Sequence, residues 1–479
     1  MSDLSSLDAV DQAGAVARGD LSPLELVDAA IAAIEAVDPA VEATLFPRFD
    51  MAREEARTLP EGGAFRGVPI LVKDLLHHVA GEPFHEGCAG VAGRKYVAGS
   101  DTVFVDKLRR AGFVILGKTK CSEFGILPTA EPALYPPSRN PWDLERTVMG
   151  SSGGSGAAVA ARMVAVATGN DLGGSLRTPA SACGVVGLKP SRGRVSLAPD
   201  FGDVVGGHVS EHVITRSVRD AAAVLDHVCG PVAGDPYAFA EPDVPFASVI
   251  ERGPNRLRIG RLVDPPGGLG VVDPSCVEAV DAALRTLAEL GHSVEDSAPD
   301  ALSDEALGVR SLEIAAAYAE FALDWWRRTL GDALAEDDVE PLTWWLTEFS
   351  RSRGIADHLA TMEWVHAFTR RVAAWWELGF DLLVTPTMAV PPPRIGWAAV
   401  DPANPLATMF KVGETTPFTM VWNMTGSPAI SLPLHHTGAG LPIGVQLVAQ
   451  MGREDHLLAT AAQLETSLPW CERHPPVCA

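Results

Sequence analysis

The chain has 479 residues and a formal net charge of −23 at pH 7, with 61 acidic side chains against 38 basic ones. Nucleic acids and anionic membranes bind through clustered basic residues, so this charge balance argues against both as partners and is compatible with a small uncharged ligand. The length allows two or three domains, but it also allows one large α/β core.

The cysteines and the apolar stretches indicate the compartment. Seven cysteines are scattered along the chain without a C-x-x-C pair, which predicts reduced thiols and neither disulfides nor zinc ligands. The first ten residues lack the basic and apolar regions of a secretory signal. The longest mostly apolar stretch, residues 157–168, contains Arg162 and is shorter than the roughly 20 residues of a membrane span. We therefore expect a cytoplasmic protein without a transmembrane segment.

The first predicted elements are a helix and two strands. Ser22 and Pro23 are a typical N-cap and first-turn pair, and the apolar spacing after them predicts a helix over residues 24–37. The apolar run at residues 68–72 predicts a buried strand, and residues 113–116 predict another.

Lys73 follows the first of these strands and is a candidate general base. Burial at a strand end lowers the pKa of an ammonium group and favours the neutral form, which can accept a proton. The alternative is a salt bridge from Lys73 to the adjacent Asp74 or to another carboxylate.

A first serine loop, GSSGGSG at residues 150–156, precedes an alanine-rich stretch. A loop-to-helix junction of this kind leaves backbone N–H groups free and brings hydroxyl groups close to a ligand, although helix capping is the ordinary alternative. The loop also matches G-x-S-x-G, which would make Ser152 the nucleophile of an α/β-hydrolase elbow. That motif needs a strand immediately before it, and residues 139–147 do not resemble one.

A second serine loop lies in NDLGGSLRTPA at residues 170–180. Its two glycines allow consecutive backbone N–H groups to point at one spot, as in an oxyanion hole, beside the hydroxyl group of Ser175. Thr178 and Pro179 predict the N-cap and the first residue of a helix. An ordinary glycine turn is the alternative. Two serines on glycine-rich loops together with a lysine indicate nucleophilic acyl chemistry with an amine as the final base.

The later part of the chain continues the alternation of strands and helices. After a segment with several prolines, residues 257–263 predict a strand and residues 276–290 predict a helix that ends at Gly291. A more helical portion then runs to about residue 377 and carries tryptophans at positions 325, 326, 344, 345, 364, 375 and 376. Such residues favour core or lid packing, with a place in a substrate wall as the alternative. The whole pattern predicts an α/β fold.

Metal and nucleotide motifs are missing from the sequence. The pair His77–His78 lacks the spacing of metal ligands, and no H-E-x-x-H occurs. Neither a P-loop nor a well-placed G-x-G-x-x-G is found. We therefore expect no metal and no cofactor.

At this point several segments together resemble the amidase signature family. They are GVPILVKD at 67–74, LGKTKCSEFG at 116–125, the passage from 150 to CGVVGLKP at 183–190, FDLLVTPT at 380–387, NMTGSPAISLP at 423–433 and PIGVQLV at 442–448. The resemblance implies a single domain over residues 1–479, with a core of about 60–235 and 378–470 and a more helical, variable portion of about 255–377. It also implies a central mixed, twisted β-sheet covered on both faces by α-helices.

The resemblance implies a Ser-cisSer-Lys triad. Ser175 would be the acylated nucleophile, Ser151 the bridging serine after a cis bond from Gly150, and Lys73 the base. The oxyanion hole would use the backbone groups of Leu172, Gly173, Gly174 and Ser175.

The residues around this triad include two departures from the family pattern. Asn170 stands where threonine is common, and Cys121 stands where many relatives have another small residue. Neither is expected to touch the triad. Cys121 could line the acyl pocket or only fill space. By resemblance, Asp171 and Arg177 are expected to be structural.

Within the family, the sequences at 139–142, 191–194, 336–340 and 452–470 look most like the 6-aminohexanoate cyclic-dimer hydrolase group, which opens a nylon-derived cyclic diamide. The implied reaction is hydrolysis of a small uncharged amide through an acyl-enzyme. A general aliphatic or aryl carboxamide amidase, a glutaminase-type subunit of a tRNA-dependent amidotransferase and a binding protein that retains the triad stay open as alternatives. The oligomeric state is also open, with a homodimer as one arrangement.

Overall fold

The computed structural model describes residues 4–239 and 242–479. In this part of the chain, eleven strands form one mixed sheet in the order β1-β3-β2-β6-β8-β7-β12-β13-β11-β9-β10. The strands are β1 Thr44–Leu45, β2 Pro69–Lys73, β3 Val114–Thr119, β6 Val166–Asp171, β7 Val186–Lys189, β8 Ser210–Thr215, β9 Arg258–Arg261, β10 Ser293–Glu295, β11 Leu382–Pro386, β12 Ala429–His436 and β13 Pro442–Ala449. Strand β2 lies between β3 and β6 and is parallel to both.

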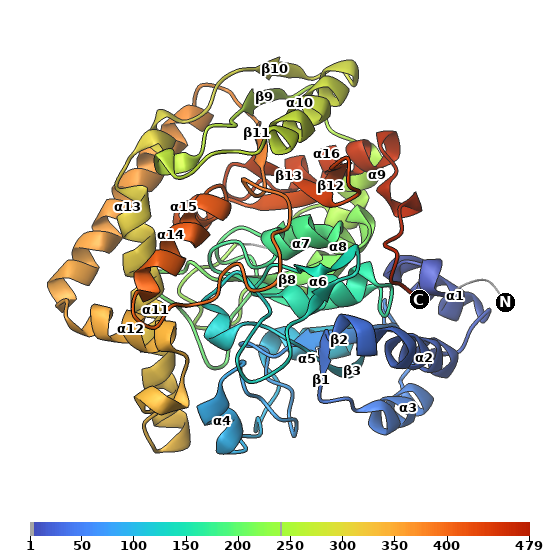
Figure 1. Cartoon of the computed structure of the whole chain (residues 1–479). Coiled ribbons are helices and arrows are strands. Elements are labelled where there is room, and N and C mark those ends of the chain that lie inside the picture. Colours follow the sequence, from blue (N-terminus) through green and yellow to red (C-terminus); the bar gives the residue numbers. More distant parts are fainter. Residues whose placement is uncertain (1–3, 240–241) are drawn as a thin grey trace.

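Helices surround this sheet (Figure 1). They are α1 Ala9–Arg18, α2 Pro23–Val41, α3 Phe49–Thr58, α4 Ala89–Gly93, α5 Val103–Ala111, α6 Gly153–Ala160, α7 Arg177–Cys183, α8 Val218–Val228, α9 Phe246–Arg252, α10 Pro274–Glu289, α11 Leu307–Leu330, α12 Pro341–Arg351, α13 Ile355–Trp376, α14 Pro405–Thr415, α15 Met420–Thr425 and α16 Glu454–Ser467. Short 3₁₀ turns are found at Leu4–Ser6, Glu123–Gly125, Pro266–Gly268, Asp300–Ser303, Glu336–Asp338 and Trp470–Glu472.

Strand β2 shows how both faces of the sheet are covered. Successive side chains of a strand point to opposite faces. Ile70 and Val72 belong to a buried cluster that also contains side chains of α5, α8, α10 and α16. Leu71, between them, belongs to a second cluster with side chains of α2, α6 and α7. A strand with helices on both faces reads as a continuous apolar run, which is why residues 68–72 predicted a buried strand. The predicted α/β class and the helix-covered mixed sheet are confirmed.

Most of the predicted elements form close to their predicted bounds. The helix predicted at 24–37 is α2, in which Ser22 and Glu25 form a capping box that satisfies free N–H groups of the first turn. The predicted strands at 113–116 and 257–263 are β3 and β9, and the helix predicted at 276–290 is α10.

Residues 139–147 were not expected to contain a strand, and this expectation is wrong. They form a small hairpin of β4 (Arg139–Asn140) and β5 (Asp143–Thr147). The hairpin is a separate sheet from the central one. Its strands are short and carry little of the apolar alternation by which strands are recognised, because they do not contribute a face to the central core.

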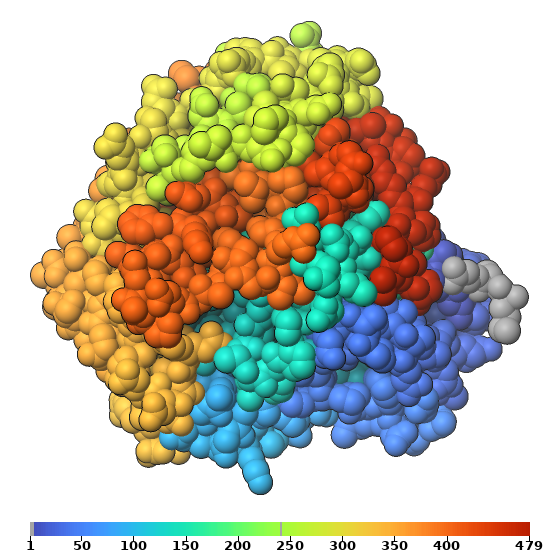
Figure 2. All heavy atoms as spheres, viewed as in Figure 1, coloured from blue at the N-terminus to red at the C-terminus, as the bar shows by residue number. Residues whose placement is uncertain are grey.

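The helical middle of the chain forms one side of the molecule. Helices α11, α12 and α13 lie together there, with α14 beside them (Figure 1). Trp326 of α11 is fully buried, and Trp375 and Trp376 of α13 pack in a core cluster. These tryptophans therefore serve core packing. Figure 2 shows the orange segment around α14 on the surface between the yellow helices and the red C-terminal segment.

The described ends of the chain meet near α1 and α2 (Figure 1). There the Ser5 hydroxyl group donates a hydrogen bond to the Ala479 carbonyl group over 3.2 Å. Over residues 4–239 and 242–479, each helix is too short or too polar to cross a bilayer.

Candidate active site

Lys73 is the last residue of β2, and its side chain is 0% exposed. Its backbone N–H group donates to the Thr168 hydroxyl group of β6 over 2.8 Å. Its Nζ atom lies 2.8 Å from the Ser151 Oγ atom and 2.6 Å from the Asn170 Oδ1 atom. Burial lowers the pKa of Lys73 to about 8, because removal from water penalises the charged form. A neutral amine is therefore accessible at mildly alkaline pH.

Asp74 does not neutralise this lysine. Its carboxylate forms a buried ion pair with Lys118 of β3, with 3.0 Å between Nζ and Oδ1. The His85 N–H group also donates to Asp74, over 3.2 Å. The alternative of a salt bridge from Lys73 to its neighbour is thus not realised.

The first serine loop brings Ser151 to the lysine. The bond between Gly150 and Ser151 is cis, as the family resemblance implies. A Cβ atom on Gly150 would lie 2.0 Å from the Thr129 carbonyl oxygen, so no other residue fits there. Ser151 is 1% exposed. The loop therefore places a buried hydroxyl group directly beside a buried amine.

Ser152 has a different environment. Its hydroxyl group donates to the Asn170 carbonyl group over 3.3 Å, and its side chain is fully buried. Strand β5 ends at Thr147, shortly before the loop, but it belongs to the hairpin and not to a central parallel sheet. The elbow interpretation fails because that motif exposes its serine at the edge of such a sheet.

A buried ion pair between Asp171 and Arg177 holds the second serine loop in place. Asp171, at the end of β6, accepts hydrogen bonds from the N–H groups of Gly174 over 2.8 Å and Leu176 over 3.1 Å. The Arg177 guanidinium group binds both carboxylate oxygens, over 2.8 and 2.9 Å. Burial alone would raise the pKa of Asp171, but the charge and hydrogen bonds of Arg177, together with Lys189 and Asn423, outweigh it and hold this pKa at about 2. The pair keeps the loop in place, in agreement with the structural role expected for both residues.

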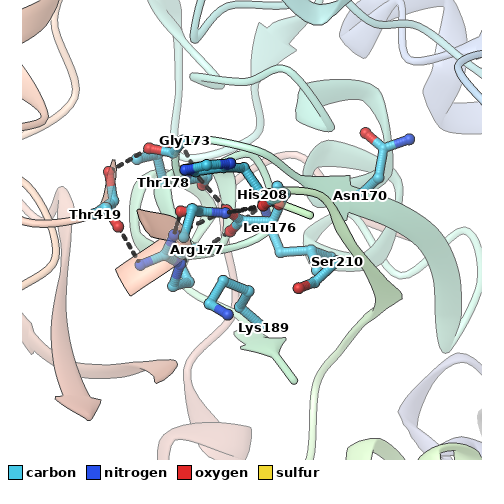
Figure 3. Close-up of polar contacts among 12 residues, drawn as sticks. Asn170, Gly173, Leu176, Arg177, Thr178, Lys189, His208, Ser210 and Thr419 are labelled. Carbon is cyan, nitrogen blue, oxygen red and sulfur yellow. Dashed lines mark hydrogen bonds and ion pairs between the residues drawn. The ribbon is translucent and has the colours of Figure 1, made fainter. Parts of the chain in front are cut away.

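A second segment, the beginning of α15, fastens the same loop (Figure 3). Arg177 donates to the Thr419 carbonyl group over 2.9 Å and to Asn423 Oδ1 over 2.7 Å. The Thr419 hydroxyl group donates to the Gly173 carbonyl group over 2.5 Å. Since α7 and α15 come from distant parts of the sequence, the shape of the loop depends on the assembled fold.

The backbone of this loop corrects one expectation. Gly174 has a φ of +133°, and a Cβ atom there would lie 2.5 Å from Thr419 Oγ1, so glycine is required. However, the Gly174 N–H group already donates to Asp171, and it is not a free oxyanion donor. Within the described chain, the N–H groups of Leu172, Gly173 and Ser175 make no hydrogen bond. These three remain available to a ligand.

Thr178 does not cap a helix, contrary to the expectation. Helix α7 begins one residue earlier, at Arg177, with Leu176 at its N-cap. The Thr178 hydroxyl group lies 2.6 Å from the Gly150 carbonyl group and 3.0 Å from that of Gly174. It therefore joins the two serine loops to each other.

Ser151 and Ser175 line one cavity of about 410 Å³. Leu172, Gly173 and Gly174 lie on its wall together with them. The rest of the wall is mostly apolar and is formed by the 3₁₀ turn Glu123–Gly125 and by α11, α14 and α15. Glu305, an exposed residue, is the only charged side chain on the described wall. The helical middle of the chain thus shapes the space in front of the serines.

The wall, as far as the structure describes it, includes neither a tryptophan nor Cys121. Cys121 is 1% exposed and packs in a cluster with Leu75 and Phe124, whose side chains face the cavity. Its Sγ atom lies 3.5 Å from the Asp74 carbonyl oxygen, and burial raises the pKa of the thiol. Cys121 fills space behind the wall.

Asn170 was expected not to touch the triad residues, and this expectation is wrong. Its Oδ1 atom accepts a hydrogen bond from Lys73, and its Nδ2 atom donates to the Leu75 carbonyl group over 2.8 Å. The topology could have revealed this contact, since β2 and β6 are parallel neighbours whose carboxyl ends meet at one edge of the sheet.

Histidine and acidic side chains do not gather as metal ligands in this region. His77 lies between the Thr168 hydroxyl group, at 2.8 Å, and Glu211, at 3.3 Å. Among the residues that the structure describes, no three His, Cys, Asp or Glu side chains form a group that could hold a metal ion.

Comparison with known proteins agrees with this geometry. The family model described as Amidase matches residues 25–458. The 6-aminohexanoate-cyclic-dimer hydrolase of Pseudomonas sp. (strain NK87) is 41% identical over 475 residues, which cover 98% of this chain and 96% of that protein.

Solved structures show the same likeness. A 6-aminohexanoate cyclic dimer hydrolase complexed with substrate superposes with a TM-score of 0.93 at 40% identity, covering 99% of this chain and 100% of that one. A bacterial aryl acylamidase of the amidase signature family has a TM-score of 0.85 at 26% identity and covers 97% of this chain and 96% of its own. The chain therefore belongs to the amidase family, and it is an amide hydrolase of the amidase signature type.

Proposed function

We propose that this amidase cleaves a small uncharged amide with Ser175 as nucleophile, Ser151 as proton bridge and Lys73 as base. One observation carries the proposal: the buried Lys73 amine lies 2.8 Å from the Ser151 hydroxyl group, and Ser151 shares a cavity wall with Ser175. A serine hydroxyl group is a weak nucleophile and needs a neighbouring base. Lys73 supplies that base, because burial favours its neutral form.

In the acylation step, the Ser175 oxygen attacks the amide carbon and forms a tetrahedral intermediate. The Ser175 proton passes to Ser151, whose own proton passes to Lys73. Collapse of the intermediate breaks the C–N bond, and the same relay returns a proton to the leaving amine. Water then attacks the acyl-enzyme ester along the same route. The products are the amine and the acid, and Ser175 is regenerated.

The negative charge of the intermediate needs donors at the same place. The N–H groups of Leu172, Gly173 and Ser175 are assigned this role, since these residues line the cavity and their N–H groups make no hydrogen bond within the described chain. The ion pair of Asp171 and Arg177 holds the loop before substrate arrives. Donors that are already in place stabilise the transition state by about 3–4 kcal/mol each.

The substrate is proposed to be a compact amide, with the 6-aminohexanoate cyclic dimer among those that are opened. The support is the likeness over nearly the whole chain to a hydrolase named for that compound, and a mostly apolar cavity of about 410 Å³. An aliphatic or aryl amide is the second candidate, favoured by the structural likeness to an aryl acylamidase.

Glutamine fits this cavity poorly. Its α-carboxylate would need a cationic partner, and the described wall carries neither lysine nor arginine. This observation weighs against a glutaminase subunit.

A single domain and a cytoplasmic location belong to the same proposal. The eleven-stranded central sheet supports the single domain, and the seven free cysteines of the described chain support the location. A homodimer stays a prediction, and light scattering, which measures the mass of the particle in solution, would test it.

A panel of cyclic, linear aliphatic and aryl amides tests the proposal. Release of amine is measured for the wild-type protein and for Ser175→Ala, after both have shown the same thermal unfolding. Turnover of uncharged amides that disappears in Ser175→Ala is the expected result. Turnover that persists in this variant would reject the relay, and preference for glutamine would reject the substrate class.

A further inference from the structure

Asn170 is the second polar partner of the Lys73 amine. Its Oδ1 atom lies 2.6 Å from Nζ, closer than the Ser151 Oγ atom at 2.8 Å. Asn170 is 3% exposed, and it lies on the wall of the cavity. A buried amide group at this place contacts the base directly, in a position that substrate would cover.

The orientation of the Asn170 amide group is fixed by its other contact. The Nδ2 atom donates to the Leu75 carbonyl group over 2.8 Å. The opposite orientation would set the Asn170 oxygen against the Leu75 carbonyl oxygen, and two acceptors in contact repel each other. The group facing Lys73 is therefore the amide oxygen, which only accepts hydrogen bonds.

The backbone of Asn170 is equally constrained. It lies in β6, where it pairs with Glu211 of β8, and its carbonyl group accepts a hydrogen bond from Ser152. Strand β6 is in turn the parallel neighbour of β2, which ends at Lys73. The sheet thus holds the amide oxygen and the amine at a set distance.

A neutral amine has two N–H groups and one lone pair. With one N–H group bound to the Asn170 oxygen, rotation about the last side-chain bond is restricted, and the other positions of the nitrogen can face Ser151. Resting on the relay proposed above, we propose that Asn170 is a positioning residue, which aims the Lys73 amine at Ser151 through an uncharged acceptor.

The absence of charge on this acceptor matters because negative groups already surround the lysine. Burial has the largest effect on the pKa of Lys73 and lowers it, while the carboxylates of Asp171, Glu86 and Glu211 act to raise it. A carboxylate at position 170 would add an opposite charge in direct contact, which typically shifts a pKa by about 1–3 units. It would keep the amine protonated over the range where the enzyme needs it neutral.

Asn170→Asp tests this directly, since it preserves the size of the side chain and adds the charge. In this variant the alkaline rise of kcat/KM is expected to move up by at least about one pH unit, with activity at pH 7 reduced about tenfold or more and recovered at high pH. Asn170→Ala removes the acceptor without adding charge. We expect its kcat to fall at least about tenfold, with KM within about twofold of wild type and the midpoint of the rise unchanged within about half a unit.

Asn140 provides the matched control. It is a buried asparagine of β4 whose Nδ2 atom donates to the Thr147 and Ala182 carbonyl groups over 3.2 and 2.8 Å. Asn140→Asp also buries a carboxylate, so it reports the general loss of stability, and the midpoint of its pH profile should match that of wild type.

Two results would overturn the positioning role: an Asn170→Asp profile that superimposes on wild type, or a kcat of Asn170→Ala within twofold of wild type. If Asn170→Asp does not fold, the kcat of Asn170→Ala decides alone. Failure of the relay itself is recognised separately, because Ser175→Ala would then retain activity.

Discussion

The Lys73 amine and the Ser151 hydroxyl group lie 2.8 Å apart, and both side chains are buried. Lys73 is held by a strand between two parallel neighbours, and Ser151 follows a glycine that no other residue can replace. A base buried in this way remains partly neutral without help from a histidine. The contact explains how a lysine can activate a serine here.

Alanine variants of one serine from each loop, Ser175 and Ser152, test which hydroxyl group is the nucleophile. We expect Ser175→Ala to reduce amide hydrolysis by several orders of magnitude, because it removes the nucleophile. Ser152→Ala should keep activity within about tenfold, since that hydroxyl group only donates to the Asn170 carbonyl group. Initial rates on one uncharged amide, at equal folded protein, provide the comparison. If Ser175→Ala retains more than about a hundredth of the wild-type rate, Ser175 is not the nucleophile.

Lys73 and Ser151 should act as a unit. Each single alanine variant is expected to lose several orders of magnitude in kcat. The kcat of the double variant should be little lower than that of the less active single variant. The reason is that removal of either side chain already stops the proton transfer, so removal of the second has little further effect. A double-mutant cycle on kcat/KM measures this. Losses that add up in logarithm would instead mean that the two side chains act independently.

The pH profile follows from the lysine. Its pKa is lowered from 10.5 to about 8 by burial, and the working form is the deprotonated one. Activity should therefore fall as pH drops below about 8 and level off above it. About one amine in eleven is neutral at pH 7 and about ten in eleven at pH 9, so kcat/KM should rise roughly tenfold between them.

Lys73→Arg is the control for this profile. A guanidinium group keeps the positive charge but does not deprotonate in this range, so the variant should stay inactive at every pH. An Arg variant with a wild-type pH profile would assign the titration to another group.

Much of the catalytic centre could be predicted because its signals are local. A lysine after an apolar run and serines among glycines are visible in the sequence, since glycine is needed wherever backbones approach closely, as Gly150 approaches Thr129. The sheet was predictable for the same reason: strands buried on both faces are continuously apolar.

Contacts between distant segments could not be predicted in this way. Thr178 reads locally as a helix cap, but its hydroxyl group meets Gly150 because α7 packs against the first loop. The Gly174 N–H group reads as an oxyanion donor, but the Asp171 carboxylate turns back onto it. Asn170 meets Lys73 only after β6 pairs with β2. In each case the partner is set by the tertiary fold, which overrides the local pattern.

The ion pair under the second loop should be important for both stability and activity. Arg177→Met leaves the Asp171 carboxylate buried without its partner, and breaking such a pair typically costs about 3–5 kcal/mol. The loop that carries Ser175 also loses its tie to Thr419, so kcat should fall even in the folded fraction. Urea unfolding and steady-state kinetics measure the two effects.

A surface pair serves as the control. Arg110 and Asp106 form an exposed ion pair, and Arg110→Ala should change stability by no more than about 1 kcal/mol and leave activity unchanged. Equal losses in the two arginine variants would contradict a special role for Arg177.

The last prediction concerns the substrate. Attack by Ser175 on a cyclic diamide leaves the amine tethered to the acyl group, so hydrolysis yields one linear product heavier by one water. We expect wild-type protein to produce this mass from the 6-aminohexanoate cyclic dimer, and Ser175→Ala to produce none. Glutamine should be hydrolysed at least about a hundredfold more slowly than an uncharged amide of similar size, because burying its carboxylate without a cation costs several kcal/mol. Mass spectrometry of both reactions decides. If the linear product never forms while aryl or aliphatic amides turn over readily, the cyclic-dimer assignment is wrong and the second candidate takes its place.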